Sequence, residues 1–341
     1  MKPILYLTQR YRPEFEATSK EINLLSNKFN GKVHDLHLDG YLKYKFNSRL
    51  SSYHFLYYPL GLVPLYLESR KRILHLYTSL CDRPYLPFLD KKKMVITSTN
   101  FLSRERIIKS KKYLDKVWGI VVQAERQRQE LLLAGISPER IHLIYPPVEL
   151  EKFNCQKPLG AFTILNASCP GKARDLKKRG IYFLLDVGRY LGDEKITFLG
   201  RGGEFSLFAD RMKNKTCKHI SIENKIYADI NEQYAKVHCT IIPYLQLDEY
   251  LKLIPTSLIE SLAAGKPVLV SSKTGVADII AANACGVVFE PTTVGLLAAL
   301  AKLRKNYPHY QLNCRKTAEK YFSAEIFLKK HQQIYARLEA L

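Results

Sequence analysis

The sequence predicts an α/β protein made of two doubly wound domains in tandem, and three observations carry this prediction. Short apolar runs, typical of buried parallel strands, alternate with helix-like segments along the whole chain. The length of 341 residues fits two ordinary domains. The double proline Pro146-Pro147 follows a predicted strand and precedes a polar stretch that runs to Leu159, so it indicates a domain boundary.

The first half of the chain opens with a predicted βαβ unit. Ile4–Thr8 is short and apolar, and the polar segment Gln9–Ala17 predicts an unusually long loop after it. Thr18 and Glu21 have the spacing of a capping box, which predicts that a helix begins there, and Lys32–Leu38 is the next predicted strand. Loops at the carboxyl ends of parallel strands face the ligand crevice, so the first loop is a candidate binding segment.

The same alternation continues to the end of the chain. The further predicted strands are Val117–Val122, Ile141–Tyr145, Phe162–Asn166, Lys195–Leu199, His238–Tyr244 and Val268–Ser272. The further predicted helices are Ala124–Ala134, Ile181–Leu191, Thr256–Ala264 and a long amphipathic helix over Ala318–Leu341. We place the two domains at residues 1–153 and 154–324, with a C-terminal helix at about residues 325–341 able to pack back on the first.

Charge is the one unusual feature of the composition. The chain has 53 Lys and Arg against 32 Asp and Glu, a formal net charge of +21. The charge is spread over both halves and forms no basic tail, so it suggests an anionic partner: nucleic acid, a phosphate-bearing substrate or an acidic membrane. Because no nucleic-acid-binding module is recognisable, nucleic acid is the least favoured of the three.

The location of the protein is predicted from absent signals. No apolar run is long enough for a membrane span, and the first residues do not resemble a signal peptide. The 7 cysteines are odd in number and form no CxxC pair, which argues against a zinc knuckle or a disulfide framework. We expect a cytoplasmic protein, with or without peripheral attachment to the inner face of the membrane.

The sharpest local motif is IPTSLIESLAAGKPVLVSS, which spans Ile254–Ser272. Pro255 suits the first helical position, so the backbone amides of Thr256, Ser257 and Leu258 are expected to be free to bind a phosphate at the helix start. Glu260 lies one turn further on, where it could accept hydrogen bonds from the hydroxyl pair of a sugar. The competing interpretation is a capped crossover helix with a solvated glutamate.

A second motif is KARDLKKRG, from Lys172 to Gly180. Arg174 and Arg179 flank a predicted loop before a helix, where two cations oppose the helix dipole unless an anion such as a diphosphate lies between them. The alternative is a solvated basic loop. The turn Gly200-Arg201-Gly202-Gly203 follows a strand and is only a weak phosphate-binding signal.

A third segment, Tyr41–Leu67, is rich in Tyr, Phe, Leu and basic residues and ends near Arg70-Lys71-Arg72. Aromatic side chains interleaved with cations favour an interfacial membrane patch or a groove for a lipid acceptor. They equally fit an irregular core edge covered by the stems of lysines.

Taken in order, these blocks resemble the retaining nucleotide-sugar glycosyltransferases of the family 4 type (glycosyl transferases group 1). The resemblance spans nearly the whole chain. It is carried by ILYLTQRYRPEFEATSKEINLLS, DKVWGIVVQAERQRQELLLAGISPERIHLIYPPVELEKF, FLGRGG, IPTSLIESLAAGKPVLVSSKTGVADII, CGVVFEP and YFSAEIFLKKHQQIYARL. It implies the GT-B fold, in which two Rossmann-like domains face each other across a cleft.

The resemblance also implies the chemistry and its residues. The C-terminal domain would bind a UDP- or GDP-sugar, the N-terminal domain would bind a lipid-linked or polysaccharide acceptor, and neither a metal nor another cofactor would be needed. Arg174, Arg179 and Glu260 would form the catalytic set, the two arginines at the diphosphate and the glutamate at the nucleotide ribose. The donor would further contact Gly200, Gly202, Pro255, Thr256, Ser257, Leu258, Glu14, Ala17 and Thr18.

Three positions depart from the family pattern. Lys252 stands where the first Glu of the E-x7-E motif is expected, and Thr99 stands where a His is expected. Glu16-Ala17 replaces the usual double glycine of the first loop. We therefore assign no general base, and His75 is a substitute only by conjecture. The departures keep a second hypothesis open, a catalytically silent GT-B protein that binds a sugar nucleotide or a partner enzyme; a related epimerase is disfavoured by the N-terminal motifs.

Overall fold

The protein folds into two compact units, each built around one parallel sheet. The computed structural model describes residues 2–8, 11–14, 16–35, 67, 70–78, 92–156, 158, 160–167, 173–201, 203–212, 218–247 and 251–341. Unit 1 comprises Met1–Pro146, Glu249–Lys252 and Glu325–Leu341, and unit 2 comprises Pro147–Asp248 and Leu253–Ala324. The chain first passes from unit 1 to unit 2 between Pro146 and Pro147, at the double proline.

Unit 1 contains a six-stranded parallel sheet in the order β2-β1-β3-β4-β5-β6. Its strands are β1 (Ile4–Thr8), β2 (Lys32–Asp35), β3 (Ile73–Thr78), β4 (Met94–Ser98), β5 (Gly119–Val122) and β6 (Ile141–Leu143). Its helices are α1 (Ala17–Phe29), α4 (Arg104–Leu114), α5 (Glu125–Leu133) and α14 (Ala324–Glu339), with a 3-10 turn at Pro138–Arg140. The central strands are buried on both faces, as their continuous apolar runs predict.

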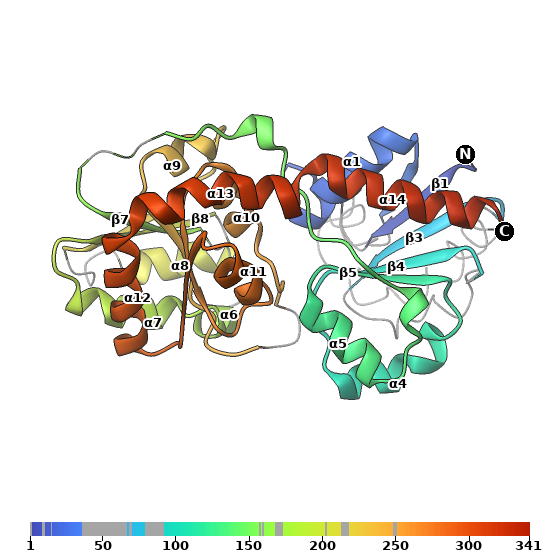
Figure 1. Ribbon diagram of the computed structural model, residues 1–341, viewed down its shortest axis with the longest axis horizontal. Coiled ribbons are helices and arrows are strands. Elements are labelled where there is room, and N and C mark those ends of the chain that lie inside the picture. Colours follow the sequence, from blue (N-terminus) through green and yellow to red (C-terminus); the bar gives the residue numbers. More distant parts are fainter. Residues whose placement is uncertain are drawn as a thin grey trace, which may run out of the picture. The chain divides into compact units, whose positions relative to one another are not determined.

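Helices cover both faces of this sheet (Figure 1). The chain-terminal helix α14 and the first helix α1 lie on one face, where Tyr335 and Leu338 join Ile22 and Leu25 in one buried cluster with the strands. Helices α4 and α5 cover the other face, in a separate apolar cluster. The last helix of the chain is therefore part of the first unit.

Two expected elements of unit 1 differ from the structure. The helix expected over Ala318–Leu341 is two helices, α13 (Tyr307–Phe322) and α14, because Ser323 between them is extended and pairs with Val148. The capping-box interpretation is wrong: α1 begins at Ala17 after Glu16, and Thr18 lies inside its first turn.

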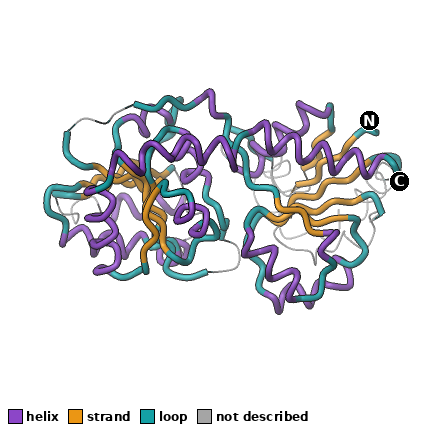
Figure 2. Tube along the Cα trace, in the orientation of Figure 1, coloured by secondary structure: helices purple, strands orange, loops and turns teal. Residues whose placement is uncertain are grey.

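Unit 2 contains a second six-stranded parallel sheet, in the order β12-β11-β10-β7-β8-β9 (Figure 2). Its strands are β7 (Thr163–Ala167), β8 (Lys195–Gly200), β9 (Ile220–Asn224), β10 (Cys239–Ile242), β11 (Val268–Ser271) and β12 (Gly286–Phe289). Its helices are α6 (Ala173–Lys178), α7 (Ile181–Val187), α8 (Gly203–Met212), α9 (Asn231–Ala235), α10 (Thr256–Ala263), α11 (Ala277–Ala282), α12 (Thr293–Lys305) and α13, with 3-10 turns at Leu150–Lys152 and Gly188–Tyr190.

The core of unit 2 follows the same two-sided plan. Helices α6, α7, α8 and α12 supply side chains to one apolar cluster with the strands. Helix α10 packs on strands β10 and β11 and against α13. Arg315 of α13 donates to the carbonyl oxygens of Leu150, Phe153 and Ala263 at 2.9, 3.0 and 2.8 Å, which fastens the linker after Pro147 to the end of α10.

Within the part of the chain that the structure describes, no helix is both long and apolar enough to cross a membrane.

Candidate active site

The candidate site lies where the strand order of unit 2 reverses. Strand β7 comes first in the sequence of this unit and pairs with β8 on one side and with β10 on the other. In open parallel sheets, ligands bind at the carboxyl ends of the strands at such a switch point. The segments that leave β7 and β10 lead to α6 and α10, the two helices that carry the predicted site residues.

Helix α10 begins as the sequence predicts. Pro255 occupies its N-cap with an extended backbone, and Gly265 ends the segment in the left-handed region at φ +68°. One detail is corrected: the amide of Leu258 donates to the carbonyl oxygen of Pro255 at 3.1 Å, so it is not free for a ligand, and the Leu258 side chain is fully buried. No acceptor among the described residues pairs with the amides of Thr256 and Ser257.

Glu260 is held by a residue that the sequence analysis missed. The hydroxyl of Tyr234, on the short helix α9, lies 3.0 Å from the carboxylate Oε2 of Glu260 and 3.1 Å from the carbonyl oxygen of Ser257. Burial raises the pKa of Tyr234 well above its usual value, and the charge of Glu260 raises it further. Tyr234 therefore keeps its proton as a donor and fixes the rotamer of a carboxylate that is itself only half-buried.

Arg179 lies in a turn that is packed tightly against the end of β10. The next residue, Gly180, has φ +72°, and a Cβ atom there would lie 2.0 Å from the carbonyl oxygen of Pro243, so only glycine fits. The amide of Leu245 donates to the carbonyl oxygen of Lys178 at 3.2 Å, which ties this turn to the segment after β10. Burial raises the pKa of Tyr244, and the charge of Arg179 opposes that rise. The structure thus places Arg179 beside the strand end that leads to α10.

The structure describes only some of the remaining predicted donor residues of unit 2. The segment expected to be a loop from Lys172 to Gly180 contains helix α6 instead, and Arg174 is in its first turn; nothing is described of the Arg174 side chain. Gly202 lies outside the described residues. Gly200 ends β8, and a Cβ atom there would lie 2.1 Å from the ring of Phe205, so close packing alone explains this glycine.

The predicted residues of unit 1 lie at the equivalent edge of the first sheet. Glu14, Ala17 and Thr18 follow β1, which borders the switch point between β1 and β3. Glu14 is exposed, whereas Ala17 and Thr18 are half-buried in the first turn of α1. The segment Tyr41–Leu67 lies outside the described residues except for Leu67, which is exposed.

Lys252, at the position where the resemblance predicts a glutamate, has a specific partner in unit 1. Its ammonium Nζ lies 2.8 Å from Oε1 of Glu21, and the exposed fractions of the two side chains are 18% and 3%. The side-chain amide of Gln123 donates to the other carboxylate oxygen of Glu21 at 2.5 Å. The lysine thus compensates a charge that helix α1 buries.

His75 is not placed to act as the general base, the role for which the resemblance gave no residue. Its ring is fully buried and lies 2.6 Å from the hydroxyl of Tyr335 and 2.7 Å from that of Thr97. Burial lowers its pKa well below the usual value, with a smaller contribution from His331. It is a core histidine. Within the described ranges, no group of three or more His, Cys, Asp or Glu side chains is placed to hold a metal ion.

A known family model matches part of the chain. Residues 174–321 match the family model described as Glycosyl transferases group 1, which covers Arg179, Tyr234, α10 and Glu260. No curated protein matches the chain.

Solved structures match the whole chain at low identity. A glycosyltransferase from Rickettsia africae is similar over 99% of this chain and 98% of its own, with a TM-score of 0.74 and 15% identity. Anabaena HepE in complex with UDP is similar over 99% of this chain and 100% of its own, with a TM-score of 0.73 and 13% identity. HepE was also solved with UDP-glucose. The lipopolysaccharide outer core galactosyltransferase WaaB is similar over 98% of this chain and 99% of its own, with a TM-score of 0.68 and 15% identity. At these identities the likeness shows the fold. The chain therefore has the GT-B fold, and its residues 174–321 match the family model described as Glycosyl transferases group 1.

Proposed function

We propose that the protein is a retaining hexosyltransferase that moves a sugar from a UDP- or GDP-sugar to a lipid-linked or polysaccharide acceptor. The observation that carries the proposal is Glu260, a half-buried carboxylate held by Tyr234 one turn into the helix that starts at the switch point of unit 2. A carboxylate at this place can accept hydrogen bonds from the hydroxyl pair of a ribose. The group 1 match over the same residues, and the UDP bound by HepE, support a nucleotide-sugar donor.

The diphosphate of the donor would lie at the start of α10. The amides of Thr256 and Ser257 and the dipole of the helix favour negative charge there. Arg179 supplies a positive charge at the same sheet edge, and Arg174 is the proposed second cation. Preorganised donors that meet developing charge in this way are each worth about 10²–10³ in rate.

The reaction needs no electron transfer and one proton transfer. The acceptor oxygen forms a bond to the anomeric carbon on the face from which the nucleoside diphosphate leaves, and the bond from that carbon to the phosphate oxygen breaks. The departing phosphate oxygen takes the proton of the acceptor hydroxyl, so the configuration is retained. In this proposal the chain's own cations and amides stabilise the leaving group, without a metal or another cofactor.

Unit 1 would bind the acceptor. Glu14, Ala17 and Thr18 are the proposed donor contacts from its first loop, and Gly200, Gly202 and Pro255 are further proposed contacts from unit 2. The net charge of +21 supports a phosphate-linked acceptor on an anionic membrane surface. We propose a cytoplasmic enzyme of polysaccharide biosynthesis that attaches peripherally; failure to co-sediment with anionic liposomes at low salt would refute the attachment.

A donor panel tests the proposal. The protein is incubated with UDP-glucose, UDP-galactose, UDP-N-acetylglucosamine and GDP-mannose, with and without a chelator, and release of the nucleoside diphosphate is measured. We expect one donor to be hydrolysed slowly at a rate that the chelator does not change. Glu260→Gln and Arg179→Ala should abolish this release, whereas the exposed controls Glu319→Gln and Arg189→Ala should retain it. Full activity of both site variants would refute the assignment.

One observation favours a second function, a catalytically silent protein that binds a sugar nucleotide or a partner enzyme. Lys252 occupies the position of a family glutamate and is committed to an ion pair with Glu21. This function predicts that UDP binds in a separate calorimetric titration and that no donor of the panel is turned over.

A further inference from the structure

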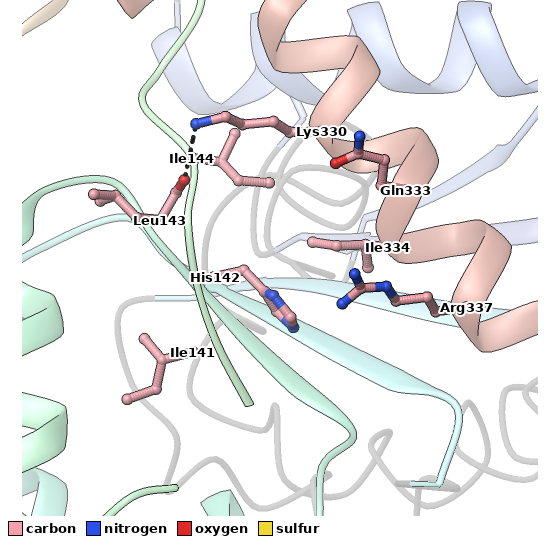
Figure 3. Close-up of a pocket in the computed structure, with 8 residues that line it drawn as sticks. All are labelled: Ile141, His142, Leu143, Ile144, Lys330, Gln333, Ile334 and Arg337. Atoms are coloured by element: carbon pink, nitrogen blue, oxygen red, sulfur yellow. Dashed lines mark hydrogen bonds between the residues drawn. The ribbon is translucent and has the colours of Figure 1, made fainter. Parts of the chain in front are cut away.

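A groove of about 300 Å³ lies within unit 1, between the edge strand β6 and the terminal helix α14 (Figure 3). The proposed reaction gives its lining residues no role, because the proposed donor contacts of unit 1, Glu14, Ala17 and Thr18, do not line it. The groove is lined by Ile141, His142, Leu143, Ile144, Lys330, Gln333, Ile334 and Arg337.

The polar side chains of the lining are three basic groups and one amide, with no carboxylate among them. Lys330, Gln333 and Arg337 are spaced three and four residues apart, so they project from one face of α14. Lys330 and Arg337 are separated by two helical turns, roughly 10 Å along the axis. The other lining residues are isoleucines and one leucine. The groove is therefore cationic at its rim and apolar along its wall.

Arg337 and His142 mark one end of the groove. In Figure 3 the guanidinium of Arg337 extends toward the ring of His142. Burial lowers the pKa of His142, and the charge of Arg337 lowers it further. Arg337 has no carboxylate among the groove's lining residues, and the buried Nε2 of His142 lies against Gly119 without a hydrogen-bond partner among the described residues. An arginine turned toward an imidazole without a counter-charge is an arrangement that a bound anion would stabilise.

The other end of the groove is closed by Lys330, whose ammonium Nζ donates to the carbonyl oxygen of Leu143 at 3.3 Å. This bond uses one of the three protons of the ammonium group and covers the open edge of β6. Its charge still contributes to the field in the groove. Between the two ends, Ile334 and Ile144 form the apolar floor.

We propose that this groove binds an organic phosphate, with the phosphoryl group between Arg337 and His142 and an apolar substituent along Ile334 toward Lys330. Arginine suits this role because its planar fork of donors matches two phosphate oxygens. The apolar wall selects against inorganic phosphate, which would leave it empty. The same chemistry is offered by a soluble phosphomonoester and by a phosphomonoester lipid headgroup.

The single tryptophan of the chain makes the proposal directly testable. The ring of Trp118 stacks on that of His142, with centroids 5.3 Å apart and planes 16° apart. A ligand that contacts His142 should therefore change Trp118 fluorescence. Phenyl phosphate, inorganic phosphate, and phosphatidylcholine vesicles with and without phosphatidic acid are each titrated into the full-length protein.

We expect saturable fluorescence changes with phenyl phosphate in the millimolar range or tighter, and weaker ones with inorganic phosphate. Arg337→Gln should weaken binding about tenfold to a hundredfold, because a charged hydrogen bond is lost. The matched control is Lys329→Gln, which removes the same charge from an exposed neighbour on α14 outside the groove. A response to phosphatidic acid vesicles with none to phenyl phosphate identifies the lipid headgroup as the source, and the reverse identifies a soluble phosphomonoester.

Two outcomes would overturn the proposal: no saturable change with any of the probes, or equal weakening by Lys329→Gln and Arg337→Gln. The second outcome would mean that phosphate responds only to the general charge of the surface. Release of nucleoside diphosphate by Arg337→Gln is measured in parallel and should be unchanged, so the result stands or falls independently of the proposed sugar transfer.

Discussion

Lys252→Met should destabilise unit 1, because it leaves the carboxylate of Glu21 buried without its counter-charge. The side chain of Glu21 is 3% exposed and that of Lys252 is 18% exposed. Removing one partner of a buried ion pair costs about 3–5 kcal/mol of unfolding free energy. Because Gln123 still donates to Glu21 and the lysine is partly solvated, we expect the lower end of this range, about 3 kcal/mol.

The double variant Glu21→Gln/Lys252→Met isolates the interaction. It removes both charges, so its cost should be about 1 kcal/mol or less, which is about 2 kcal/mol below the cost of Lys252→Met alone. Lys252→Glu introduces the residue type that the resemblance predicts at this position and should be worse than Lys252→Met, since it brings two carboxylates together.

Urea unfolding followed by tryptophan fluorescence is the assay. Trp118 is the only tryptophan, and it lies in unit 1, so the signal reports the unit that contains the ion pair. The exposed Lys305→Met is the control and should change the unfolding free energy by less than about 0.5 kcal/mol. Equal destabilisation by Lys252→Met and by the double variant would refute the reasoning, because the cost of Lys252→Met would then not come from the unpaired charge of Glu21.

Three further predictions follow from single contacts. Tyr234→Phe removes the hydroxyl that holds Glu260, so we expect weaker donor binding, seen as a raised KM in the donor assay, with a loss of only about 1 kcal/mol of stability; an unchanged KM would contradict the positioning role. Burial lowers the pKa of His331 to about 4, against about 6.5 in an unfolded chain, so below pH 6.5 the unfolded state binds a proton that the native state excludes. The unfolding free energy should therefore fall as pH drops from about 6.5 to about 4, by about 3 kcal/mol for this residue, and His331→Leu should flatten the profile measured by urea titration. Gly180→Ala should lower the melting temperature far more than Gly160→Ala, because both have positive φ but only Gly180 faces backbone within 3 Å; equal shifts would show that the contact does not matter.

The sequence predicts the architecture well because strand burial is a local signal. Ile4–Thr8 and the strand from Lys195 are found within one residue of their predicted bounds, since parallel strands buried on both faces are continuous apolar runs. The failures come from tertiary contacts. Ser323 breaks an otherwise continuous helical pattern because its backbone pairs with Val148, which lies far away in the sequence.

The site divides in the same way. The start of α10 and the Arg179-Gly180 turn were predictable, because proline, glycine and charge carry local signals for helix ends. The hydrogen-bond and ion-pair partners of the site residues were not predictable from the sequence. Tyr234 lies 26 residues before Glu260, and Lys252 lies 231 residues after Glu21, so each contact is created only by the fold. The capping-box spacing of Thr18 and Glu21 misled for this reason: Glu21 turns inward to a partner that local sequence cannot reveal.

Calorimetric titration of UDP and GDP tests the central claim, that α10 and its neighbours in unit 2 bind a nucleoside diphosphate. The account predicts that one of them binds, that Glu260→Gln and Arg179→Ala each weaken binding at least about tenfold, and that the exposed control Glu319→Gln does not. Binding that is unaffected by both site variants, or absent for both nucleotides in the folded protein, would contradict it.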